Sequence, residues 1–118
     1  MIKNCSAEEL FQEIVKVVNA SPKPIEGINA VFQYNLTGDD QATYQLHLSA
    51  GNAWVEKNSS VESNCTMQLA LDDFKKMLLG KRNGTFAFMT GKLKINGNIG
   101  LALKLEKLLR EYDFSHLR

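Results

Sequence analysis

The 118-residue sequence contains little of what several classes of protein require. Its two cysteines, Cys5 and Cys65, lie far apart and outside any C-x-x-C unit, which excludes a zinc framework and a disulfide scaffold. Apolar runs are short, and none approaches the roughly 20 residues of a membrane-spanning helix, so we expect no transmembrane segment. Lys and Arg number 14 against 13 Asp and Glu, and a formal net charge of +1 gives no global field that would attract nucleic acid or an anionic membrane.

An export signal is also missing from the start of the chain. Glu8 and Glu9 stand where a secretory signal peptide has its apolar stretch. We therefore expect a cytoplasmic protein in which both cysteines are reduced thiols.

What is present is the composition of a globular domain. Hydrophobic residues make up 44% and charged residues 23% of the chain, close to the averages for globular proteins, which argues against disorder. The length suits one domain, and no repeat or linker divides it, so we expect a single domain over residues 1–118.

The spacing of apolar residues predicts helices around a set of strands. Ser6 and Glu9 form a capping-box pattern before a first helix, which ends ahead of Pro22. A short helix is expected from its cap at Asp72 to Gly80, and a last helix over about 98–112. Alternation with a period of two predicts strands at 28–36, 42–49, 53–56, 65–71 and 92–96, whereas 85–90 fits neither pattern. These elements predict an α+β fold, in which helices cover the apolar face of one antiparallel-rich sheet.

Groups suited to catalysis or metal binding do not converge in the sequence. His47 lies on the polar face of a predicted strand and His116 lies in the tail, and we expect a solvated imidazole at both. The paired carboxylates fall in turns and in first turns of helices, and no catalytic or metal-binding motif is present. We therefore expect no enzyme activity, no metal and no cofactor.

A Gly-x-x-Gly loop at Gly97–Gly100 opens the last helix, as in nucleic-acid-binding KH domains. Ile99 inside the loop and the near-zero net charge argue against contact with phosphates. The glycines are equally suited to a tight turn at Gly97 and a close packing contact at Gly100, so we expect no nucleic-acid partner.

The last helix carries more apolar surface than one sheet can cover. Leu101, Leu105, Leu108, Leu109 and Tyr112 form one stripe, and Ile99 and Leu103 point the opposite way. The second side needs a cover of its own: segment 86–89, another chain or an apolar ligand. Three methionines, Met67, Met77 and Met89, add flexible side chains that suit surfaces of variable shape or fill gaps in a core.

The last half of the chain resembles the sterol carrier protein 2 (SCP2) family over roughly residues 65–112. The similar motifs are Leu71-Asp72-Asp73-Phe74, Leu79-Gly80-Lys81, Phe86-Ala87-Phe88 and the run from Gly91 to Leu105, of which GKLKINGN is the most specific. The resemblance implies a five-stranded, mostly antiparallel sheet covered on one face by helices, with a hydrophobic tunnel between them.

The resemblance also implies a function, which is non-catalytic binding and intracellular transfer or presentation of lipids. Ser115-His116-Leu117 is followed by Arg118, so the peroxisomal signal of some family members is not expected here. A free-standing domain without that signal resembles bacterial or archaeal family members, and most such cells make no sterol, so we expect fatty acid or fatty acyl-CoA rather than a sterol-like ligand. The alternative is an accessory or dimerising module for a lipid-pathway enzyme. The residues expected to line the lipid site are Phe32, Tyr34, Leu46, Leu48, Met67, Phe74, Met77, Phe86, Phe88, Met89, Leu101, Leu105 and Leu108.

Overall fold

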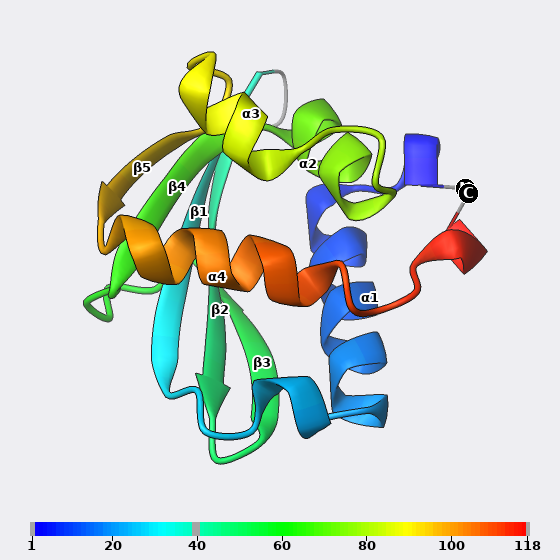
Figure 1. Ribbon diagram of the computed structural model, residues 1–118, viewed down its shortest axis with the longest axis vertical. Helices are drawn as coiled ribbons and strands as arrows, with labels where there is room; N and C mark the ends of the chain where they lie inside the picture. Colours follow the sequence, from blue (N-terminus) through cyan, green and yellow to red (C-terminus); the bar gives the residue numbers. More distant parts are fainter. Residues whose placement is uncertain (1, 39–40, 118) are drawn as a thin grey trace.

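The computed structural model describes residues 2–38 and 41–117 and contains one mixed sheet with helices packed against it (Figure 1). The strands are β1 (Ala30–Thr37), β2 (Ala42–Ser49), β3 (Asn52–Lys57), β4 (Cys65–Ala70) and β5 (Lys94–Gly97). The helices are α1 (Ala7–Ala20), α2 (Leu71–Leu78), α3 (Gly84–Met89) and α4 (Ile99–Leu109), with 3-10 turns η1 (Ile2–Asn4), η2 (Lys23–Ile25) and η3 (Ser115–Leu117).

The strands follow the spatial order β3-β2-β1-β4-β5. Every neighbouring pair is antiparallel except β1 and β4, which run parallel. The α+β class and the mostly antiparallel sheet predicted from the sequence are therefore confirmed.

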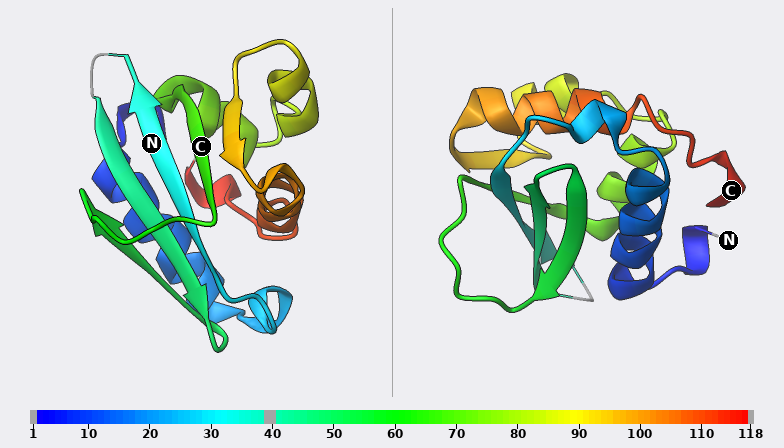
Figure 2. Two further views of the ribbon diagram at one scale, coloured as in Figure 1. Left: turned by 90° about the vertical axis from the view of Figure 1, so that its left-hand side faces the viewer. Right: turned by 90° about the horizontal axis from the view of Figure 1, so that it is seen from below.

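One face of the sheet is apolar and faces the helices. Phe32 on β1 lies opposite Leu46 on β2, and Tyr34 lies opposite Met67 on β4, which places their side chains on one face. Helix α1 packs beside β3, and α2 and α4 pack against β4, so two groups of helices share this face (Figure 2). The core lies between the sheet and these helices.

The predicted capping box of α1 is confirmed. The Glu9 N–H donates to Ser6 Oγ at 3.1 Å, and the Ser6 N–H donates to Glu9 Oε1 at 3.0 Å. The bond to the Ser6 backbone, more than that to its hydroxyl, lowers the pKa of Glu9. This reciprocal pair fixes where α1 begins.

Two other helix starts differ from the prediction. Ala70, not Asp72, is the N-cap of α2, and Asp72 lies in the first turn, where it pairs with Lys76 at 3.1 Å. Segment 85–90, which the pattern left unassigned, is mostly helix α3, because the Asn83 side chain accepts a hydrogen bond from the Phe86 N–H and starts a helix.

The last helix starts where the sequence places it but ends earlier, at Leu109. Gly97 precedes it with a φ of +90°, and a Cβ there would lie 2.8 Å from the Asn64 carbonyl oxygen. Gly97 therefore serves the tight turn that was expected. Gly100 is exposed and makes no close packing contact, so that part of the prediction is wrong.

The expected solvation of His47 is also wrong. His47 does lie on the polar face, yet it is only 7% exposed. The reason is topological: β3 lies at one edge and β4 lies beyond β1, so segment 58–64 must cross the polar face. Its Val61 carbonyl accepts a hydrogen bond from Gln45 at 2.6 Å, and Trp54 stacks on the His47 ring with centroids 5.1 Å apart.

Candidate functional site

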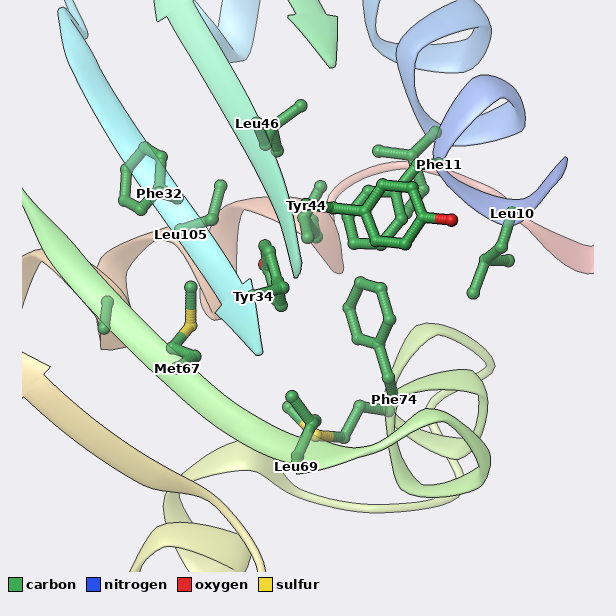
Figure 3. Packing of buried hydrophobic residues seen from close by; sticks show 14 of the residues in the cluster. Leu10, Phe11, Phe32, Tyr34, Tyr44, Leu46, Met67, Leu69, Phe74 and Leu105 are labelled. Atoms are coloured by element: carbon green, nitrogen blue, oxygen red, sulfur yellow. The ribbon is translucent and has the colours of Figure 1, made fainter. Parts of the chain in front are cut away.

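A small apolar pocket lies between the sheet and helices α2 and α4. It is lined by side chains of β1, β4, α2, α4 and the residues next to α4 and β5. The lining residues are Tyr34, Met67, Leu69, Phe74, Met77, Leu78, Leu93, Glu106, Leu109 and Arg110. Figure 3 shows Tyr34, Met67, Leu69 and Phe74 directed toward one another from β1, β4 and α2.

Aromatic rings close one side of the pocket. Phe74 packs on Tyr34 with ring centroids 4.8 Å apart, and Phe11 of α1 packs on both of them (Figure 3). Tyr44 stacks on the far side of Phe11 at 4.8 Å. These contacts hold the Tyr34 ring in place, because offset and edge-on aromatic pairs prefer a defined geometry.

The Tyr34 hydroxyl is the unusual group of the pocket. Tyr34 is 3% exposed, and its hydroxyl makes no hydrogen bond within residues 2–38 and 41–117. Every fully enclosed side-chain nitrogen or oxygen in those residues has a hydrogen-bond partner, so the Tyr34 hydroxyl is not fully enclosed and keeps some accessible surface. Burial foremost, with smaller effects of Cys65 and Glu106, raises the pKa of Tyr34, so the hydroxyl keeps its proton and can donate it to a hydrogen bond.

Glu106 and Arg110 form the polar rim of the pocket. The Glu106 carboxylate is largely buried and accepts hydrogen bonds from Arg110 Nε at 3.0 Å, Arg110 Nη2 at 3.2 Å and the Gly84 N–H at 3.2 Å. A Cβ on Gly84 would collide with the Glu106 side chain, so only glycine permits this approach. Glu106 thereby links α4 to the start of α3.

Beyond the rim, the pocket continues into a surface groove of about 240 Å³ that shares Leu78 and Arg110 with it. The groove is also lined by Leu79, Gly80, Tyr112, Asp113, Phe114 and Ser115, so its lining is both polar and apolar. The largely apolar pocket and this mixed groove meet at Leu78 and Arg110.

The pocket is closed in this structure. Its interior has room for about 20 Å³, which is about one water molecule. Sites for small organic ligands measure roughly 300–1,000 Å³. Within the described residues there is no continuous tunnel of the kind the family resemblance implies.

Of the 13 residues expected to line a lipid site, four line this pocket: Tyr34, Met67, Phe74 and Met77. Five more are buried elsewhere in the same core: Phe32, Leu46, Leu48, Leu105 and Leu108. Phe88 and Leu101 are half-buried against that core, whereas Phe86 and Met89 are exposed on α3. Contact of any of the 13 with lipid stays a prediction.

Sequence reasoning missed the polar part of the site. Glu106 lies in the last helix and Arg110 directly follows it, and from the sequence we interpreted this helix through its apolar stripe. A signal was available, because Glu106 is the first carboxylate after Asp73 in a long stretch without acidic residues. A carboxylate in a largely apolar helix that packs against a core indicates an ion-pair or hydrogen-bond partner within the protein, because buried carboxylates are almost always paired.

Outside the pocket, the two histidines lie apart from each other. His47 is buried on the polar face, and His116 is exposed in η3. No group of three or more His, Cys, Asp or Glu that could hold a metal occurs in the part of the chain that the structure describes. None of the described helices is both long and apolar enough to cross a membrane.

Comparison with solved structures identifies the fold. The apo form of sterol carrier protein 2 from Yarrowia lipolytica matches with a TM-score of 0.72 and 27% identity, over 86% of this chain and 87% of that chain. The sec-alkylsulfatase Pisa1 from Pseudomonas sp. matches with a TM-score of 0.81 and 16% identity, over 96% of this chain but only 17% of that chain. At that identity, the second likeness concerns the fold alone.

Comparison of sequences places the chain in a family. Hydroxysteroid dehydrogenase-like protein 2 of Mus musculus is 44% identical over 109 residues, which is 92% of this chain and 22% of the relative. The chain thus spans about a quarter or less of the length of the curated relatives it matches. The sequence model of the SCP-2 sterol transfer family matches residues 11–110. With most of its length covered by that match, the chain belongs to the SCP-2 sterol transfer family.

Proposed function

We propose that this chain binds one lipid between the sheet and helices α2 and α4 and carries or presents it without altering it. The observation that carries the proposal is the Tyr34 hydroxyl in a largely apolar pocket, because it makes no hydrogen bond within the described residues and keeps accessible surface, so it is available to a ligand. A polar head group between Tyr34 and Glu106, with an alkyl tail against the apolar walls, would use this arrangement.

Binding requires the pocket to enlarge. An acyl chain of about 16 carbons gains roughly 0.8 kcal/mol per buried methylene before entropic costs, which is ample to separate a few side chains. Met67 and Met77 line the pocket, and unbranched methionine side chains adapt to irregular shapes more easily than leucine does. We therefore infer that α2 and α4 move away from β4 when lipid enters.

The polar groups of the pocket favour an uncharged hydroxyl as the lipid's head. A hydroxyl can accept a hydrogen bond from Tyr34 and donate one to Glu106, whereas a carboxylate can only accept. Glu106 also holds the Arg110 guanidinium through two nitrogens, so an incoming carboxylate would compete with it for that cation. A sterol-like or long-chain alcohol is then a better ligand than a fatty acid anion, which differs from the preference drawn from the sequence.

A role next to an enzyme is a second part of the proposal. The similar relatives are named as dehydrogenase-like proteins, and this chain corresponds to only part of them. A lipid held in this domain would be presented to an attached or associated enzyme. The same binding site serves both roles, so the pocket is the part to test first.

The test is a titration of delipidated protein with hexadecanol and with palmitate, each delivered from cyclodextrin and monitored by native mass spectrometry. We expect one hexadecanol per chain and weaker binding of palmitate. Glu106→Gln keeps the acceptor for the Gly84 N–H but removes the charge, so palmitate should then bind about tenfold more tightly, a gain of roughly 1.4 kcal/mol.

Glu111→Gln is the matched control, because Glu111 is exposed and is not one of the residues that line the pocket. It should leave both affinities unchanged. Absence of binding by both lipids would refute the proposed function. Binding of both with no change in Glu106→Gln would refute only the placement of the head group.

A further inference from the structure

Helix α3 exposes two large apolar side chains on one face. Phe86 is 63% exposed and Met89 is 77% exposed, and residues three apart lie on the same side of a helix. Ala87, between them in sequence, is buried beneath the helix. In the left-hand view of Figure 2, α3 stands beside β5 at the edge of the molecule that is farthest from β3.

The chain around α3 is strongly basic. Between Asp73 and Glu106 the sequence has seven Lys or Arg residues and no carboxylate. Three of the seven are engaged: the Lys75 ammonium donates to the Cys5 carbonyl, Lys76 pairs with Asp72, and Arg82 pairs with Asp73.

The other four basic residues make no ion pair within the described part of the chain: Lys81, Lys92, Lys94 and Lys104. Lys81 lies just before α3 and Lys92 just after it. Lys94 lies opposite Gln68 on the sheet face turned away from the helices, so it does not belong to this surface. In sequence, the segment with exposed Phe86 and Met89 is therefore flanked by two unpaired positive charges.

This face is connected to the rim of the pocket. The Gly84 N–H at the start of α3 donates to Glu106, and the Leu93 N–H donates to the Ala87 carbonyl at 3.0 Å. Both Glu106 and Leu93 line the pocket. A partner that binds α3 would thus contact the helix that is hydrogen-bonded to two residues of the pocket lining.

We propose that α3, with Lys81 and Lys92, is a docking surface for an anionic phospholipid membrane. Phe86 and Met89 enter the boundary between head groups and acyl chains, and the lysines lie against the phosphates and carboxylates. A second copy of this chain is a poorer occupant, because its own unpaired lysines would face these ones. The surface does not depend on which lipid the pocket takes.

Co-sedimentation with vesicles tests the proposal. The protein should bind vesicles of phosphatidylcholine mixed with phosphatidylserine, and bind vesicles of phosphatidylcholine alone much less. Each lysine near the surface contributes about fivefold, so Lys81→Ser with Lys92→Ser should weaken binding by roughly 25-fold. Raised salt should have the same effect because it screens the charges.

Phe86→Ser with Met89→Ser should abolish vesicle binding. Without the two apolar side chains nothing inserts into the bilayer, and only the electrostatic attraction of the lysines to the membrane surface is left. Val61→Ser is the matched control, since Val61 is 49% exposed on the segment that crosses the opposite face of the sheet. Equal binding by the control and by Phe86→Ser with Met89→Ser would refute the docking surface.

Two further outcomes separate this proposal from the previous one. Analytical ultracentrifugation without vesicles should give a monomer, and a dimer lost in Phe86→Ser with Met89→Ser would overturn the membrane as the occupant. Hexadecanol binding in solution is measured independently. If the protein binds vesicles but does not bind hexadecanol, the proposed lipid binding in the pocket is refuted and the docking surface is not.

Discussion

Replacing Tyr34 by Phe should leave the stability of the free protein almost unchanged, although Tyr34 lies in the core. Its hydroxyl makes no hydrogen bond within the described residues, so its removal breaks none. The hydroxyl is not fully enclosed, and the pocket beside it has room for about one water, so it carries no large desolvation cost either. We expect Tyr34→Phe to change the free energy of unfolding by less than about 0.5 kcal/mol, whereas a lost hydrogen bond costs about 0.5–1.5 kcal/mol.

Tyr112→Phe is the matched comparison. The Tyr112 hydroxyl donates to the Ser21 carbonyl at 2.7 Å, so its removal should lower the free energy of unfolding by about 0.5–1.5 kcal/mol. Urea unfolding followed by the fluorescence of Trp54 measures both, because Trp54 lies over His47 on the opposite face of the sheet from the pocket.

The same variant should affect binding. Tyr34→Phe should weaken hexadecanol binding while it leaves the stability of the free protein almost unchanged, because the hydroxyl serves the ligand and not the fold. If Tyr34→Phe destabilises the protein as much as Tyr112→Phe does, the hydroxyl has a structural partner and the reasoning about the pocket is wrong.

Two further predictions concern the sheet beneath the pocket. Burial raises the pKa of Cys65 from 9.0 to about 11, so its neutral thiol stabilises the fold below about pH 9 and this contribution is lost as pH rises through about 11. Urea unfolding between these pH values should show a steeper decline in the free energy of unfolding for the wild-type protein than for Cys65→Ala, and parallel curves would contradict the prediction. Gly97→Ala should cost about 2–3 kcal/mol, because its Cβ would meet the Asn64 carbonyl at a φ of +90°. Gly91 has a similar φ of +82°, but no atom lies within 4 Å of its Cβ position, so Gly91→Ala should lower the free energy of unfolding clearly less. Equal losses of stability in the two variants would show that backbone strain, and not the collision with Asn64, accounts for the effect.

The regular elements could be predicted from the sequence because period and capping are local properties. Phe32, Tyr34, Leu46 and Met67 alternate with polar residues, and alternation alone assigns them to one face of a sheet. Helix α3 could not be predicted in this way, since six residues carry too little periodicity and Asn83-Gly84 is equally typical of a turn.

The site was only partly predictable because it depends on pairings between distant segments. Nothing local indicates that segment 58–64 crosses the sheet and buries His47; this follows from the parallel pairing of β1 with β4. Likewise, Glu106 acquires its role through Gly84 and Arg110, and the Tyr34 hydroxyl is unusual only because its surroundings lack a partner. The alternation of apolar residues predicted that Tyr34 lines the lipid site, but it did not predict a role for the Tyr34 hydroxyl.

Methionine methyl NMR gives the most direct test that a lipid occupies this pocket. Met67 and Met77 line the pocket, whereas Met89 lies exposed on α3. In protein labelled at the methionine methyl groups, one equivalent of hexadecanol should shift the signals of Met67 and Met77 to saturation and leave that of Met89 in place. Unchanged signals of Met67 and Met77 in the presence of bound hexadecanol would place the lipid elsewhere and contradict the account.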